Sequence, residues 1–185
     1  CYLELRELRN PIFLNEKKND KIVEGDEILV QVVKDIQQTK APVVTTSFGI
    51  KSDNLILTHG KNNIGISNKI VDDKDRNRLK TLFKPYKNDN YGYVVRTSAK
   101  DVSDEDIIEE IEDLAKKYTD IISKATYATC FSCVYTTPPT FICDIKEMVN
   151  KTIEEIVIED DNLCETASKQ LISICNKIDI KLRHY

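Results

Sequence analysis

The chain has 185 residues, of which 41% are hydrophobic and 31% charged, and its net charge is −4. This composition supports a buried core in one large or two small domains and excludes a disordered tail. No apolar run approaches the roughly 20 residues of a transmembrane helix, so no membrane partner is expected. No signal peptide is visible, which favours a cytoplasmic location, and the start at Cys1 rather than Met predicts further residues upstream.

The charges are unevenly distributed along the chain. Residues 34–100 hold 13 Lys and Arg against 6 Asp and Glu, a balance of +7, whereas the rest of the chain holds 14 against 25. A basic middle third favours contact with an anion. The alternative is an ordinary solvated surface of mixed charge.

The first part of the chain predicts short β-strands. Residues 2–3 begin a strand, and residues 27–34 and 43–46 are rich in β-branched side chains and are spaced as a hairpin. Together they suggest the closing strands of a small barrel whose opening strands precede Cys1. Lys40 lies in the loop of that hairpin, where barrels of the OB type contact single-stranded nucleic acids, although a lone lysine is more often simply solvated.

The middle of the chain alternates strands with helices. Strands are expected at residues 54–57, 64–66 and 91–95. A helix is expected from Asp72 or Asp73 to about Phe83. A longer helix over residues 103–125 starts with the capping-box pattern of Ser103. Its outer face is expected to be solvated, and no function is assigned to the acidic residues there, Glu109, Glu110, Glu112 and Asp113.

Arg96 and Thr97 directly follow the strand expected at residues 91–95. A strand end presents both side chains at a rim, where an Arg fork donates two parallel hydrogen bonds to one phosphate and a Thr hydroxyl adds another. The pair is therefore a candidate phosphate site. The alternative is an arginine in a surface ion pair.

The last third predicts strands at residues 131–135, 153–159 and 178–182, with helices at residues 140–149 and from Asp161. Asp161 is expected to cap its helix. The alternation of strands and helices indicates an α/β layer beside the β-rich part, and so an α+β chain. His59 and His184 have no motif around them.

Six cysteines occur, and reduced thiols are the default without a secretory signal. Cys130 and Cys133 form a single CxxC, which lacks the two further ligands of a closed zinc site. Packing of reduced, metal-free cysteines is favoured over metal or redox chemistry, and the full set is Cys1, Cys130, Cys133, Cys143, Cys164 and Cys175.

Several strings then occur in the order found in a known family. They are residues 25–34, 39–40, 45–46, 55–57, 64–67, 69–70, 75–76, 79–80, 92–97, 153–158 and 180–182. In this order they resemble the bacterial RNase E/G endoribonuclease family over about residues 25–185. The resemblance implies the C-terminal part of an OB-fold RNA-binding domain at residues 1–47, a sensor of the RNA 5′ end at residues 48–126, and an RNase H-like subdomain at residues 127–185.

The resemblance also implies roles for individual residues. Arg96 and Thr97 would bind an RNA 5′-monophosphate, with backbone help from the region of Ser52 and Ile56. Lys40 and Lys69 would contact RNA. The chain departs from the family's pattern in having Ser52, Asn68 and the pair Ala41 and Pro42 where the family usually has glycine, a basic residue and glycine.

The implied parent would hydrolyse single-stranded RNA with magnesium and would form a homo-oligomer. Its catalytic domain and its zinc-binding cysteine pair would lie beyond Tyr185, so no catalytic residue, metal or cofactor is expected in this chain. Two alternatives stay open: a non-catalytic interaction domain that binds an acidic protein partner, and a metal-dependent hydrolase that uses Glu159, Asp160 and Asp161.

Overall fold

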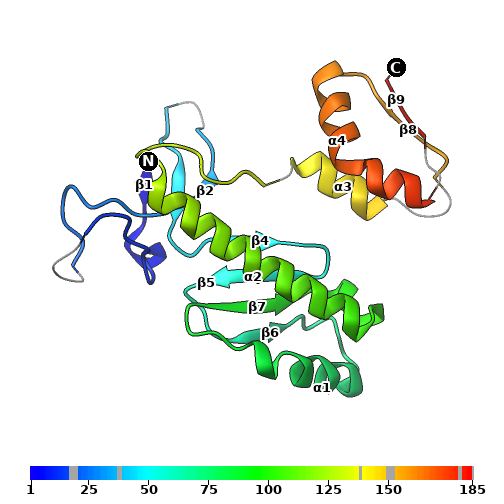
Figure 1. Cartoon of the computed structure of the whole chain (residues 1–185), viewed down its shortest axis with the longest axis horizontal. Helices are drawn as coiled ribbons and strands as arrows, with labels where there is room; N and C mark the ends of the chain where they lie inside the picture. The colour runs from blue at the N-terminus through cyan, green and yellow to red at the C-terminus, as the bar shows by residue number, and fades with distance from the viewer. Residues whose placement is uncertain (17–20, 37–38, 138, 149–152, 179–180, 185) are drawn as a thin grey trace. The chain divides into compact units, whose positions relative to one another are not determined.

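The computed structural model describes residues 1–16, 21–36, 39–137, 139–148, 153–178 and 181–184 (Figure 1). The chain divides into two units, Cys1–Tyr135 and Thr136–Tyr185. Both units combine strands and helices, which confirms the α+β class. Of the described helices, none has the length and apolarity that crossing a membrane would require.

A three-stranded sheet begins the first unit. It is formed by β1 (Tyr2–Leu3), β2 (Gln31–Lys34) and β3 (Val43–Thr45) in the order β1-β3-β2. The expected hairpin is present, because β2 and β3 pair antiparallel. β2 is shorter than predicted because residues 27–29 pair elsewhere: Leu14 N donates to Glu27 O, and Leu29 N donates to Ile12 O. The described strands do not close into a barrel.

A four-stranded sheet forms the centre of the first unit. It contains β4 (Gly49–Lys51), β5 (Leu55–His59), β6 (Ile64–Ile66) and β7 (Tyr91–Val95) in the order β4-β5-β7-β6. β5 runs antiparallel to β4 and β7, whereas β6 runs parallel to β7. Leu55, Leu57 and His59 are buried in β5 and alternate with half-buried residues, so one face of the sheet is packed and the other is more open.

Two helices cover the packed face. α1 (Asp73–Leu82) packs on β6 and α2 (Asp104–Tyr127) packs on β5. Both begin where the sequence predicts, because Asp72 accepts a hydrogen bond from Lys74 N and Ser103 accepts one from Asp106 N. Alternating steps of four and three residues bring one stripe of α2 to the core: Ile107, Ile111, Leu114, Tyr118, Ile121 and Ala125.

His59 is buried in this core. Its Nε2 lies 2.7 Å from Asn10 O, which only accepts hydrogen bonds, so Nε2 carries the proton. In the neutral ring Nδ1 then accepts from the Tyr118 hydroxyl at 2.9 Å. The rings of His59, Phe48 and Tyr118 form a mutually stacked cluster, with centroids 4.9 to 5.9 Å apart.

The second unit contains α3 (Thr140–Met148), β8 (Glu155–Ile158), α4 (Asp161–Ile178) and β9 (Lys181–His184). β8 and β9 pair in parallel, and Ile142 packs with Ala167 and Leu171 beneath them. The last strand starts three residues later than predicted, because α4 continues to Ile178.

Two predictions for the last third of the chain are wrong. Residues 131–135 form no strand, because Phe131 has a φ of 66°, which is incompatible with extended backbone, and its side chain is fully exposed. Asp161 does not cap α4. Asp160 does, since its Oδ1 accepts from Leu163 N at 2.9 Å.

Candidate phosphate-binding site

Arg96 lies where β7 ends and is held against the loop between β4 and β5. Its backbone N donates to Asn54 O at 2.8 Å. Its guanidinium Nη1 donates to Asp53 O at 2.9 Å and, more weakly, to Ser52 O at 3.4 Å. Val95, the residue before Arg96, is buried and anchors the end of β7. Together with this anchor, these contacts fix the guanidinium beside the loop of residues 52–54.

Hydroxyl groups surround this arginine. The exposed Thr97 has its Oγ1 3.2 Å from Ser67 Oγ, at the end of β6. Ser98 Oγ donates to Asp53 O at 3.1 Å. Strands β6 and β7 therefore deliver a cationic group and several hydroxyls to one end of the sheet, and such groups together suit an oxyanion. We call this set, Ser52, Asp53, Ser67, Arg96, Thr97 and Ser98, the Arg96 cluster.

The loop that carries Ser52 and Asp53 is anchored from α2 by a carboxylate. Glu110 Oε1 accepts from Asn54 N at 2.8 Å and from Leu55 N at 3.2 Å, and Oε2 accepts from Asn54 Nδ2 at 2.9 Å. Three N–H groups on one ionised acceptor form a strong, directional anchor. The assignment of Glu110 to a solvated face without a role is therefore wrong: this side chain is half-buried and positions the loop.

Ser52 and Ile56, the two residues of the β4–β5 region expected to help bind phosphate, are held in different ways. Ser52 turns the loop, because both its backbone N and its Oγ donate to Leu55 O. Ile56 lies opposite Lys51 in β4 and opposite Val94 in β7, so it is paired on both sides. By strand alternation its side chain lies on the more open face, away from Leu55 and Leu57.

The two lysines predicted to contact RNA lie in different places. Lys69 is exposed, and its backbone N donates to Ser67 Oγ at 3.3 Å, so it is adjacent to the Arg96 cluster. Lys40 is exposed beside β3, in the region of the three-stranded sheet. Within the residues that the structure describes, no contact joins Lys40 to the Arg96 cluster.

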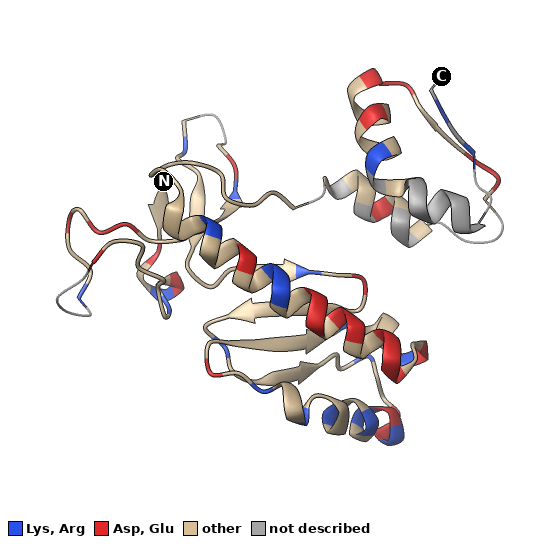
Figure 2. Ribbon diagram, viewed as in Figure 1, with Lys and Arg blue, Asp and Glu red and all other residues tan. Residues whose placement is uncertain are grey.

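Sequence reasoning missed Ser67, Asp53 and Glu110. A signal for Ser67 was present in the sequence. It directly follows the strand expected at residues 64–66, just as Arg96 directly follows the strand expected at residues 91–95. Nothing local marks Glu110, which resembles its acidic neighbours on α2. Figure 2 shows acidic residues crowding the first half of that helix, whereas basic residues recur along α1.

The cysteines and acidic residues considered as alternative metal sites do not form a set of metal ligands in the described part of the chain. Cys130 and Cys133 are exposed in the segment after α2, and Cys133 Sγ donates to Tyr135 O at 3.6 Å. Within the described residues no three His, Cys, Asp or Glu side chains gather as metal ligands do. The side chains of Cys143, Cys175 and His184 lie outside what the structure describes, and metal-free cysteines stay a prediction.

The sequence matches the family model of the ribonuclease E/G family over residues 49–185, which is most of the chain and includes the Arg96 cluster. The chain belongs to the ribonuclease E/G family. Its relatives include ribonuclease G of Haemophilus influenzae, 27% identical over 81% of this chain and 32% of the relative. Ribonuclease G of Salmonella typhimurium is 29% identical over 57% of this chain and 22% of the relative.

Ribonuclease E of Synechocystis is also similar, 24% identical over 79% of this chain and 22% of the relative. The chain thus spans a third or less of the length of these three relatives.

Proposed function

We propose that this ribonuclease E/G family chain binds single-stranded RNA and recognises its 5′-monophosphate at the Arg96 cluster. Family membership supports RNA as the ligand. The observation that carries the proposal is the hydrogen bonding of the Arg96 guanidinium to the carbonyls of Asp53 and Ser52 beside the hydroxyls of Thr97 and Ser67. These contacts hold the cation in position before a ligand arrives, so little conformational entropy is lost on binding.

Each residue has a distinct part in the proposed site. The guanidinium supplies the positive charge and directional donors, and the Thr97 hydroxyl donates to a phosphate oxygen. Lys69 adds a second cation at the same end of the sheet. Ser52 shapes the loop, and the backbone in the region of Ser52 and Ile56 adds to the site, as the family resemblance implies. Lys40 acts separately, as a contact for the RNA backbone.

We further propose that RNA hydrolysis belongs to the parent endoribonuclease and not to residues of this chain. In the parent, magnesium would supply charge stabilisation at the reacting phosphodiester, and the parent would be a homo-oligomer. Asp160 is used as a helix cap, which supports a structural role for the acidic residues 159–161. Incubation of the chain with single-stranded RNA and magnesium should give no product. Cleavage that Asp160→Asn abolishes would contradict this division of labour.

Binding to two RNAs that differ only at the 5′ end tests the proposed recognition. Fluorescence anisotropy at one fixed salt concentration should show tighter binding of a 5′-monophosphate RNA than of its 5′-hydroxyl counterpart. Thr97→Val should reduce this preference, whereas Lys40→Gln should weaken both RNAs equally. Equal binding of the two RNAs by the unaltered chain would show that the Arg96 cluster does not sense the 5′ end.

A further inference from the structure

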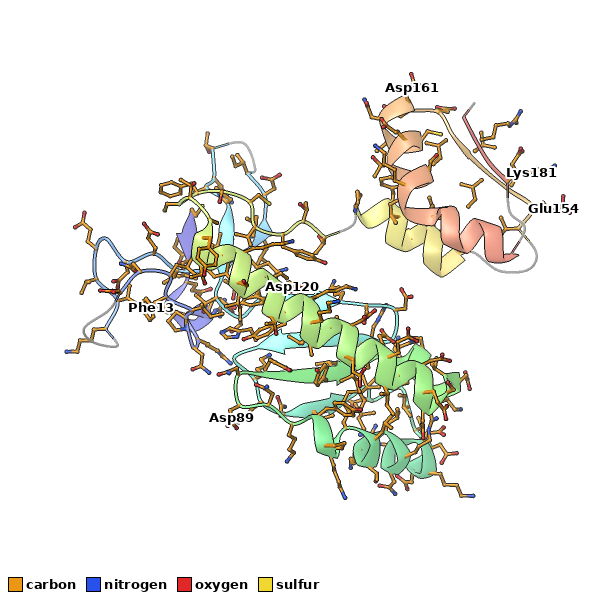
Figure 3. The ribbon with its side chains drawn as sticks, viewed as in Figure 1. Phe13, Asp89, Asp120, Glu154, Asp161 and Lys181 are labelled. Carbon is orange, nitrogen blue, oxygen red and sulfur yellow. The ribbon has the colours of Figure 1, made fainter. Side chains whose placement is uncertain are left out.

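A second basic site lies at the other end of the four-stranded sheet. A concave pocket of about 590 Å³ opens there between the end of α1, the loop between β5 and β6, and the segment just before β7. Lys80, Lys84 and Lys87 line one side of it. Asn62 and Asn63, in the loop between β5 and β6, line the other. Figure 3 labels Asp89, which also lines the pocket, just before β7.

The pocket is distinct from the Arg96 cluster. Asp89 comes just before β7 and Arg96 comes just after it, so the full strand separates them. Five residues of β-strand span roughly 16 Å at about 3.3 Å per residue. One phosphate cannot contact both sites, whereas a flexible polyanion such as single-stranded RNA can.

The charges in the pocket favour an anion. Three lysines face one carboxylate, Asp89, which leaves a surplus of two positive charges. The three lysines are exposed, and none of them forms an ion pair with another residue in the described part of the chain. Lys80, in the last turn of α1, also suits the negative end of the helix dipole. Lys87 lies beyond the helix, so the dipole does not account for it.

The wall opposite the lysines is held rigidly. Tyr93 N donates to Asn63 O at 3.2 Å, and Gly60 N donates to Asn90 O at 2.8 Å, which fastens the loop between β5 and β6 to the start of β7. Asn88 Oδ1 accepts from Asn90 N at 2.9 Å, which orients its carboxamide. The pocket therefore combines exposed cations on one side with a loop held by backbone hydrogen bonds on the other.

We propose that this pocket binds the phosphodiester backbone of single-stranded RNA, as a second contact independent of the 5′ end. Lysines contact phosphates as point charges, and asparagine side chains bond to phosphate and sugar oxygens. Asparagine amides both donate and accept, which suits the ribose 2′-hydroxyls that lie beside the phosphates of RNA. No aromatic side chain is among the lining residues described, so the contact does not depend on base stacking. The inference rests on the proposed RNA binding but not on recognition of the 5′ end.

The test compares two triple variants that remove equal charge from the 185-residue chain. One carries Lys80→Gln, Lys84→Gln and Lys87→Gln. The matched control carries Lys116→Gln, Lys117→Gln and Lys124→Gln, on the exposed side of α2. Anisotropy with a 3′-labelled single-stranded RNA is measured over a series of salt concentrations, and circular dichroism checks folding. Lys84→Gln alone serves if the first triple variant does not fold.

The pocket variant should bind both 5′-monophosphate and 5′-hydroxyl RNA about tenfold more weakly. The steepness of log affinity against log salt should fall by about 2, because each of the three lost phosphate contacts accounts for roughly 0.7 of it. The control should change the slope far less. Equal losses in the two variants would overturn the inference, as would equally effective competition by polyglutamate of matched charge. If the unaltered chain bound no RNA, both the proposed function and the proposed pocket contact would fail. If the unaltered chain distinguished the two 5′ ends while the pocket variant bound RNA normally, only the pocket contact would fail.

Discussion

Glu110 Oε1 accepts a hydrogen bond from Asn54 N at 2.8 Å, which ties the second turn of α2 to the loop beside Arg96. Glu110→Ala should leave three N–H groups without this acceptor and destabilise the chain by about 1–3 kcal/mol. It should also reduce any preference for 5′-monophosphate RNA. Glu109→Ala, on the exposed side of the same turn, is the control. Urea unfolding measures the effect, and equal midpoints for the two variants would contradict the anchoring role.

Gly92 lies so close to neighbouring backbone that no side chain fits there. A Cβ there would overlap the carbonyl oxygens of Asn63 and Lys61 and lie 2.9 Å from Asn63 N. Gly92→Ala should therefore displace the loop between β5 and β6 and destabilise the chain by about 1–3 kcal/mol or more. Gly65→Ala is the matched control, because its Cβ would lie at an ordinary 3.7 Å from Val94 Cγ2. Thermal unfolding should separate the two variants clearly, and the reverse order would refute the close approach.

Tyr118 makes stability sensitive to alkaline pH. Burial, and then the charge of Tyr91, raises the pKa of Tyr118 to about 12. The unfolded phenol has a pKa of about 10, so the folded state binds its proton more tightly. The free energy of unfolding should be unaffected below about pH 10 and should fall as the pH rises from about 10 to 12. In Tyr118→Phe this fall should be shallower. Urea unfolding at several alkaline pH values measures it, and parallel curves for the two proteins would count against it.

Local signals predicted much of the fold. The strand at residues 91–95, the helix caps at Asp72 and Ser103 and the buried stripe of α2 depend on short-range patterns, and the structure confirms them. The prediction of a strand at residues 131–135 was wrong. Apolar residues alternate there, but no strand in the described part of the chain pairs with them. Asp160 and Asp161 are adjacent candidates for the cap of α4, and composition alone does not separate them.

Tertiary contacts limited what could be predicted for the candidate site. Arg96 and Thr97 were singled out because they end a strand, a feature visible in the sequence. Their partners come from residues some 30 to 45 positions away, such as Ser67 and Asp53. Sequence periodicity says nothing about which loop lies beside a strand end, so the anchoring contact of Glu110 was invisible until the sheet order was known.

The central claim is that Arg96 recognises an RNA 5′-phosphate, and a thermodynamic cycle measures this directly. Binding of 5′-monophosphate and 5′-hydroxyl RNA is measured for the unaltered chain and for Arg96→Ala at one fixed salt concentration. Lys124→Ala is the control, because it also removes one positive charge but lies on the exposed side of α2, outside the Arg96 cluster. The coupling between Arg96 and the 5′-phosphate should be about 1.5–3 kcal/mol, a tenfold to hundredfold effect, and Lys124→Ala should show little. If Arg96→Ala weakened both RNAs by the same factor, the coupling would be zero and recognition of the 5′ end by this residue would be contradicted.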